Sequence, residues 1–375
     1  MQIGCTKKLL DYLGCEVQVM DTAAPSIFNF TANIITVARR KCIAVVHNES
    51  RCGFVIYGVT AKNKGALPAL ILQGIERMLR KERFCDEIIS RFLADCGKAV
   101  FTKTADRVCV SRINKFCEWV MIYSPQFRGD STFQEHLLPK LNGDLVKLGG
   151  DYEYAFKKLA LLLETYYEAP LFRYRAAVLD VDLILSDGVC NRRIVVPLYI
   201  SLFHLHIMIQ TVFEWKNRHL HSFVLNVAAD GTVLERAALF GEDDIYGAPG
   251  VRMHDELRMN LWEVFAKRKA ILYEYDYGDG WLHRITLVRE IEDCTFPAPV
   301  CERADVKAPP EDCGGPEGFA DLKKILGDPS NEEYRNAVEW YGYTELRNKG
   351  IRMINSDLQD AIRVFPEDWV EEYDG

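Results

Sequence analysis

The stretch Tyr275-Asp276-Tyr277-Gly278-Asp279-Gly280-Trp281-Leu282-His283 decides the fold of the second half of the chain. Alternating residues lead into Asp-Gly, which suits a two-residue type I′ turn because both central positions need positive φ. We expect a hairpin in which Asp276 lies opposite His283, so that a carboxylate stands beside an imidazole. Asp276 and His283 are therefore candidate catalytic residues. The alternative is that the glycines serve backbone geometry and the aromatic residues serve the core.

A second dense stretch follows at residues 309–315, Pro-Pro-Glu-Asp-Cys-Gly-Gly. Rigid prolines before a flexible Gly-Gly indicate an ordered loop that leads into a helix. Glu311 is a further candidate catalytic residue, as a base or a support for a metal ligand. The simpler alternative is that Glu311 or Asp312 caps the helix that follows.

Six of the eight histidines lie between residues 204 and 283. We expect His219 and His221 on one face of a strand, because they are two residues apart. The candidate metal ligands are His206, His219, His221 and His283, and the donor chemistry suits zinc or another divalent metal such as iron(II). The alternative is that these rings are hydrogen-bonded within the core, since the spacing of known metal motifs is missing.

Composition indicates a globular protein of two domains, with 375 residues, 49% hydrophobic and 27% charged. We expect a cytoplasmic location and no membrane partner, because no apolar run approaches the ~20 residues of a membrane span and the first residues do not look like a signal peptide. The twelve cysteines include no Cys-x-x-Cys pair. We interpret them as buried free thiols.

Charge is distributed unevenly along the chain. Residues 1–128 carry 19 Lys and Arg against 11 Asp and Glu, whereas the remainder carries 27 against 43. The first half could therefore meet nucleic acid or an acidic protein, or the two halves could attract each other. The candidate nucleic-acid-binding residues are Lys7, Lys8, Arg39, Arg40, Lys41, Lys103 and Arg107. The alternative is ordinary solvated charge, because no helix-turn-helix accompanies these residues.

The order of predicted elements favours an α+β fold with mixed or antiparallel sheets and packed helices. Residues 1–124 read as a basic α+β domain. Glycine and proline interrupt the pattern after residue 124, so we place a linker and a connecting helix at 125–171. An acidic α+β domain follows at 172–375, beginning with a strand at 174–186 and a helix at 202–215.

Residues from about 172 to 365 resemble the plasmid pRiA4b ORF-3-like domain. The motifs that carry the resemblance are the Leu205-His206 helix with Trp215, the His219-Leu220-His221 strand, the hairpin from Tyr273 to His283, and Pro309 to Gly315. This chain departs from the family pattern at Ala308, where a cysteine is usual, and at Arg192-Arg193, which lacks the preceding Pro-x-Trp. A cysteine-based metal site is accordingly not expected.

The first 124 residues look like a separate domain of unknown function. Its pattern is present as Cys5 to Leu10, Ala32-Asn33, Arg39-Arg40-Lys41 and Thr102-Lys103-Thr104. The resemblance of the second half implies an α+β fold and a mobile-element context. It implies no established activity.

Two hypotheses of function come from these patterns. The leading one is a two-domain binding module whose basic first domain contacts nucleic acid or a protein partner. The second is a metal-dependent hydrolase that uses the His/Asp cluster of the second domain. A purely structural interaction module is a third possibility if the histidines lie far apart.

Overall fold

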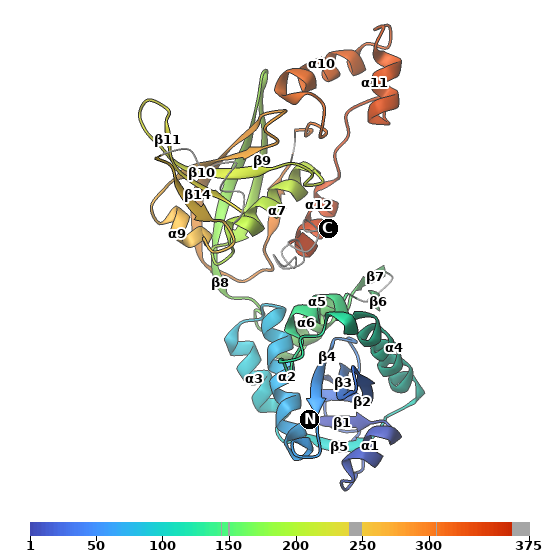
Figure 1. Ribbon diagram of the computed structural model, residues 1–375. Coiled ribbons are helices and arrows are strands. Elements are labelled where there is room, and N and C mark those ends of the chain that lie inside the picture. The colour runs from blue at the N-terminus through green and yellow to red at the C-terminus, as the bar shows by residue number, and fades with distance from the viewer. Residues whose placement is uncertain (144, 149–150, 240–249, 305, 362–375) are drawn as a thin grey trace. The chain divides into compact units, whose positions relative to one another are not determined.

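A computed structural model describes residues 1–143, 145–148, 151–239, 250–304 and 306–361 (Figure 1). The chain forms two compact units, Met1–Arg173 and Tyr174–Gly375. Each unit combines a β-sheet with packed helices, which confirms the α+β class. No helix within the described residues is both long enough and apolar enough to span a bilayer.

The first unit contains a five-stranded mixed sheet in the order β4-β3-β2-β1-β5. Strand β1 is parallel to both β2 and β5, whereas β3 is antiparallel to its two neighbours. The strands are β1 (Gln2–Cys5), β2 (Asn29–Val37), β3 (Arg40–His47), β4 (Gly53–Val59) and β5 (Val100–Lys103).

Helices cover both faces of this sheet. Along β3, Ile43 and Val45 pack with one set of helices, whereas Ala44 and Val46 pack with the other. Side chains alternate between faces in a strand, so a strand buried on both sides reads as one continuous apolar run. The first set comprises α1 (Lys7–Leu13), α2 (Leu67–Lys81), α3 (Asp86–Cys96) and α6 (Ala155–Tyr167), and the second comprises α4 (Arg107–Tyr123). The short helix α5 (Leu138–Leu141) contributes Leu138 to the first cluster and Leu141 to the second.

Residues 125–171, where we expected a linker and a connecting helix, lie within the first unit. Leu159 and Leu163 of α6 are fully buried in its core, and the amide of Cys85 donates to the carbonyl of Leu171 at 2.7 Å. A short hairpin of β6 (Leu145–Leu148) and β7 (Asp151–Tyr154) precedes α6. Two of the prolines that suggested a linker, Pro125 and Pro139, instead lie at the start of short helices within this unit.

The second unit contains an eight-stranded sheet in the order β12-β11-β10-β13-β14-β8-β9-β15. All neighbours are antiparallel except β11 and β12. The strands are β8 (Tyr174–Leu185), β9 (Gly188–Pro197), β10 (His221–Val227), β11 (Val233–Ala238), β12 (Arg252–Asp255), β13 (Ala270–Tyr275), β14 (Trp281–Cys294) and β15 (Val300–Arg303).

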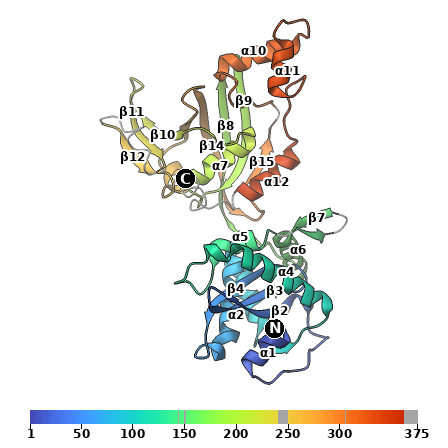
Figure 2. The ribbon, with the colours of Figure 1, turned by 45° about the vertical axis from the view of Figure 1, so that its right-hand side comes forward.

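Helix α7 (Leu202–Phe213) lies against this sheet (Figure 2), and most of its residues are buried. Helix α12 (Ile351–Ala361) packs beside α7 and β15, and α9 (Leu261–Phe265) follows β12. Helices α10 (Gly315–Gly327) and α11 (Tyr334–Tyr341) pack on each other near the β8–β9 turn, where Lys323 pairs with Asp187. Because α7 is almost wholly enclosed, its sequence is apolar around nearly the whole helix.

Replacing Gly74 of α2 by alanine tests the packing of the first unit. A Cβ atom there would lie 2.0 Å from a ring carbon of Phe54, which is itself buried in the core. We expect the free energy of unfolding to fall by about 2 kcal/mol or more, as in other overpacked cores. Urea denaturation of the full chain measures this change. The matched variant Gly65→Ala places its Cβ in open space and should stay within about 0.5 kcal/mol of wild type; equal stability of both variants would contradict the packing described.

Candidate metal centre

The hairpin of β13 and β14 has a different register from the one expected. Tyr275 pairs with Trp281 and Tyr273 pairs with His283, so the expected pairing of Asp276 with His283 is wrong. The turn comprises five residues, 276–280, rather than two. Asp276 adopts a φ of 54°, and its carbonyl accepts a hydrogen bond from the amide of Gly280 at 2.6 Å. The aspartate therefore ends the strand before the Asp-Gly pair is reached.

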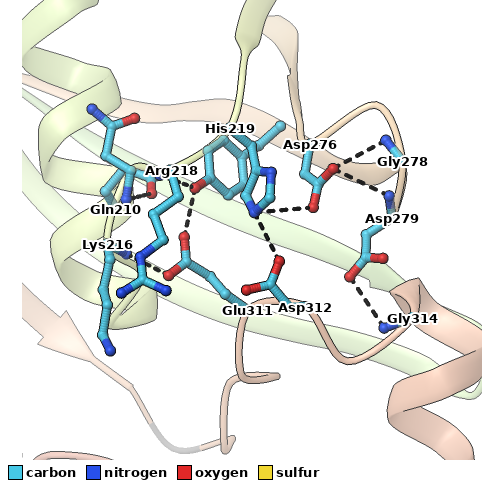
Figure 3. Close-up of polar contacts among 12 residues, drawn as sticks. Gln210, Lys216, Arg218, His219, Asp276, Gly278, Asp279, Glu311, Asp312 and Gly314 are labelled. Atoms are coloured by element: carbon cyan, nitrogen blue, oxygen red, sulfur yellow. Dashed lines mark hydrogen bonds and ion pairs between the residues drawn. The ribbon is translucent and has the colours of Figure 1, made fainter.

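The side chain of Asp276 is held within this turn. One carboxylate oxygen, Oδ1, accepts hydrogen bonds from the amides of Gly278 at 3.0 Å and Asp279 at 3.3 Å (Figure 3). Asp and Asn tolerate the left-handed region because they form such local bonds. The second oxygen, Oδ2, is left to face His219.

The loop at residues 309–315 is anchored on the end of α7 and on β13. Trp215 Nε1 donates to the carbonyl of Pro309 at 2.8 Å. The carboxylate of Glu311 accepts from the Tyr275 hydroxyl at 2.6 Å and from the amide of Lys216 at 2.8 Å (Figure 3). Burial, together with the neighbouring Glu311 carboxylate, raises the pKa of Tyr275, so the hydroxyl keeps its proton and donates. Both oxygens of Glu311 thus hold the loop in place.

The same loop also contacts the hairpin turn. The amide of Gly314 donates to Oδ2 of Asp279 at 3.2 Å. At Gly315, φ is 71°, and a Cβ atom would lie 2.3 Å from the carbonyl oxygen of Asp279. Glycine is therefore required where the two backbones approach each other. Helix α10 begins here with Gly314 at its N-cap and no side-chain cap, so the expected cap by Glu311 or Asp312 is not present.

These contacts bring His219, Asp276 and Asp312 together. His219 Nε2 lies 2.9 Å from Asp312 Oδ1 and 3.5 Å from Asp276 Oδ2. The three ligand-type atoms all lie within 4.8 Å of one another, and no other such group of His, Cys, Asp or Glu is found in the described part of the chain. The side chains are 29%, 10% and 52% exposed, respectively, so the cluster opens to solvent.

His219 lies outside the strand in which we expected it. Strand β10 begins at His221, so the alternation of side chains in a strand does not apply to His219. The two rings accordingly have different surroundings. His219 meets the ring of Tyr275 edge-on at 5.8 Å, whereas His221 is buried in the interior of the unit.

His206 and His221 form a stacked pair, with ring centroids 3.5 Å apart and planes inclined by 5°. His221 Nε2 lies 3.1 Å from each oxygen of the buried Glu256, and His206 Nδ1 lies 2.7 Å from the hydroxyl of Tyr273. Burial and the neighbouring His221 lower the pKa of His206 well below its ordinary value. Two of the candidate metal ligands therefore lie next to each other inside the core, each with one ring nitrogen within hydrogen-bond distance of a buried side chain.

His283 lies apart from both groups. Its ring is fully buried and meets Phe213 at 4.9 Å and Trp215 at 5.4 Å, edge to face. Burial lowers the pKa of His283 to about 3, so the ring is neutral at physiological pH. Of the four histidines, the structure brings only His219 to a group that could hold a metal. Asp312 completes this group, and its place beside Glu311 in the Pro-Pro-Glu-Asp motif is the signal that could have found it.

Acidification tests the burial of His283. The pKa of the ring in the folded chain lies below its ordinary value of 6.5, so its contribution to stability is complete above pH 6.5 and is lost as the pH falls toward 3. His283→Phe removes this proton uptake by the unfolded chain. Between pH 6.5 and 4, urea denaturation should show a decline in unfolding free energy that is shallower by up to about 1.4 kcal/mol per pH unit. An unchanged slope would mean that the ring is not buried as described.

Both units are similar to known protein families. Residues 175–349 match the family described as plasmid pRiA4b ORF-3-like protein, and residues 2–158 match a domain of unknown function, DUF6933. The uncharacterized protein y4hQ of Sinorhizobium fredii (strain NBRC 101917 / NGR234) is 31% identical over 198 residues, which cover 51% of this chain and 92% of that protein.

A crystal structure of a protein of unknown function from Methanosarcina mazei Go1 is also similar. It is 25% identical, with a TM-score of 0.41, over 48% of this chain and 97% of that one. The motifs whose geometry forms the His219, Asp276 and Asp312 cluster all lie within residues 175–349. Through its second unit, the chain belongs to the plasmid pRiA4b ORF-3-like protein family.

Proposed function

We propose that the second unit binds a divalent metal ion through His219, Asp276 and Asp312. The observation that carries this proposal is the convergence of one imidazole nitrogen and two carboxylate oxygens from three separate segments of the chain. Ligands held ~2.1 Å from a tetrahedral metal lie roughly 3.4 Å from one another. The distances of 2.9 and 3.5 Å from His219 Nε2 are close to that value. A metal ion bound there would replace the present hydrogen bond between His219 and Asp312.

The donor set indicates which ions fit. Imidazole suits zinc and iron, carboxylate suits manganese and magnesium, and a mixed set of one nitrogen and two oxygens suits Zn²⁺, Fe²⁺ or Mn²⁺. The partner contacts of these side chains also support the role. Asp276 is fixed by the amides of its own turn, and Asp312 sits in the loop that Glu311 anchors. Such supporting hydrogen bonds orient ligands in known metal sites.

A hydrolytic role follows from the openness of the cluster. Three protein ligands with a further position open to water are the composition of catalytic zinc sites, whereas structural sites are closed by four. The ion would supply Lewis acidity and an acidified water molecule. In this reading His219, Asp276 and Asp312 hold the ion, and Glu311 and Asp279 position the loop and the turn. His283 plays no direct part, because it is enclosed by Phe213 and Trp215.

Calorimetric titration of chelator-treated full-length protein with Zn²⁺ or Mn²⁺ tests the metal site. We expect one equivalent to bind, and Asp276→Asn or Asp312→Asn to weaken binding by at least about tenfold. Asparagine tolerates positive φ and keeps a side-chain oxygen, so both variants should fold. The matched control is Asp230→Asn, an exposed aspartate in the β10–β11 turn. Binding unchanged in both site variants would exclude this cluster as the metal site.

We propose as a second function that the first unit binds nucleic acid or another polyanion. Strands β1, β2 and β5 are parallel, so their carboxyl ends meet at one end of the sheet. The candidate basic residues follow these ends: two after β1, three at the β2–β3 turn, and two at the end of β5 and the start of α4. All seven side chains are exposed: Lys7, Lys8, Arg39, Arg40, Lys41, Lys103 and Arg107. Their gathering at one end supports a shared phosphate-binding surface.

Two lysines at opposite ends of β5 provide a matched test of this surface. Lys103 ends the strand on the basic side, whereas Lys98 precedes its other end, and both are exposed. In mobility-shift titrations of the full chain with duplex DNA and with single-stranded RNA, Lys103→Ala should weaken binding and make the salt dependence shallower by about one unit in slope. Lys98→Ala should change neither quantity. No binding at low salt, or equal effects of the two variants, would contradict the proposal.

A further inference from the structure

A groove of about 330 Å³ lies between α10 and α11 and reaches the loop at residues 309–315. Asp312, a member of the candidate metal cluster, lines one end of it. We propose that this groove binds an organic cation, an alkylguanidinium or alkylammonium group, next to the metal centre. The part of this proposal that concerns a substrate rests on the proposed metal site. The part that concerns binding of the cation depends only on the residues that line the groove.

The charges that line the groove are all negative. Asp312, Asp321 and Glu333 contribute carboxylates, and the lining includes neither lysine nor arginine. Asp321 pairs with Lys324 at 2.9 Å, but both side chains are at least 67% exposed, so this ion pair is weak and a ligand cation can compete with it. Carboxylates gathered around a concave surface raise the local concentration of cations and repel phosphates. The expected ligand is therefore opposite in charge to the one proposed for the first unit.

The remaining walls suit the hydrocarbon part of such a ligand. Leu322, Ile325 and Ala337 supply apolar surface, and Trp340 of α11 borders the groove with 53% of its surface exposed. An indole face attracts guanidinium and ammonium groups, and does so more strongly than the other aromatic rings. The apolar walls can thus contact the hydrocarbon part of a basic side chain, and the exposed tryptophan and the carboxylates can contact its charged end. The volume of the groove is at the lower end of the range for small-molecule sites, which suits a ligand of side-chain size.

The position of Asp312 links the groove to the metal centre. Its carboxylate faces His219 on one side, and the residue lines the groove on the other. A substrate whose cationic end occupied the groove would therefore present its next groups toward the cluster. The substrate class that fits is a compound that water can cleave and that carries a basic side chain, such as an amide or ester of arginine.

The experiment compares two probes of nearly equal shape, N-acetylarginine amide and N-acetylcitrulline amide, titrated calorimetrically into chelator-treated full-length protein. The ureido group of citrulline has the shape of guanidinium without its charge. We expect the arginine probe to bind and the citrulline probe to bind at least about tenfold more weakly. 1,5-Diaminopentane, as a third probe, shows whether ammonium is accepted as well as guanidinium.

Exposed residues allow matched variants that should not disturb the fold. Glu333→Gln and Trp340→Leu remove a charge and an aromatic face from the groove, and each should weaken binding of the arginine probe at least threefold. Glu339→Gln, on the same helix but outside the lining, should leave binding unchanged. Equal binding of the two amide probes, or loss of binding in Glu339→Gln alone, would overturn the proposal.

Metal titration of the same preparations separates this proposal from the proposed function. Protein that binds Zn²⁺ or Mn²⁺ but not the arginine probe would overturn the groove assignment alone. Protein that binds the arginine probe but no metal would support the groove and overturn the metal site. Binding of both supports the two proposals together.

Discussion

The carboxylate of Glu311 joins three parts of the second unit. One oxygen accepts from the Tyr275 hydroxyl at the end of β13, and the other accepts from the amide of Lys216 just after α7. These two bonds fix the loop at residues 309–315 beside the hairpin turn. Together with the Trp215–Pro309 and Gly314–Asp279 hydrogen bonds, they set the position of Asp312 relative to His219. Hydrogen bonds to a charged acceptor are stronger than neutral ones, so one side chain can hold a loop that has no regular structure of its own.

Backbone conformation supplies the second constraint. Asp276 and Asp312 both adopt positive φ, at 54° and 61°, which is uncommon for residues other than glycine. Residues held in sparsely populated conformations cluster at functional sites, where the surrounding structure determines them. Here the conformation directs two carboxylates toward one imidazole. The hydrogen bonds from the turn amides to Asp276, and the contacts of Glu311 in the loop of Asp312, offset the free-energy cost of the positive φ angles.

Much of the fold could be predicted from residue patterns. The helix expected at 202–215 is α7, and the strand expected at 174–186 is β8, because long periodic segments are the clearest signals. The α+β class follows from the same patterns. The hairpin register could not be predicted in this way. Asp279-Gly280 favours a two-residue turn, but the local hydrogen bonds of Asp276 end the strand earlier, and a competing turn of this kind is visible only in three dimensions.

The candidate site could be predicted from the sequence only in part. The resemblance to the plasmid pRiA4b ORF-3-like family indicated that the histidine, hairpin and Pro-Pro motifs belong to one domain, and His219 and Asp276 do meet. Spacing could not distinguish His219 from His221, because this depends on where β10 begins. The central claim is that His219, Asp276 and Asp312 bind one metal ion. Anomalous diffraction from crystals grown with Zn²⁺ tests it most directly. The account predicts a single strong peak within ~2.0–2.2 Å of His219 Nε2 and of both carboxylates; a peak elsewhere, with none at this cluster, would contradict it.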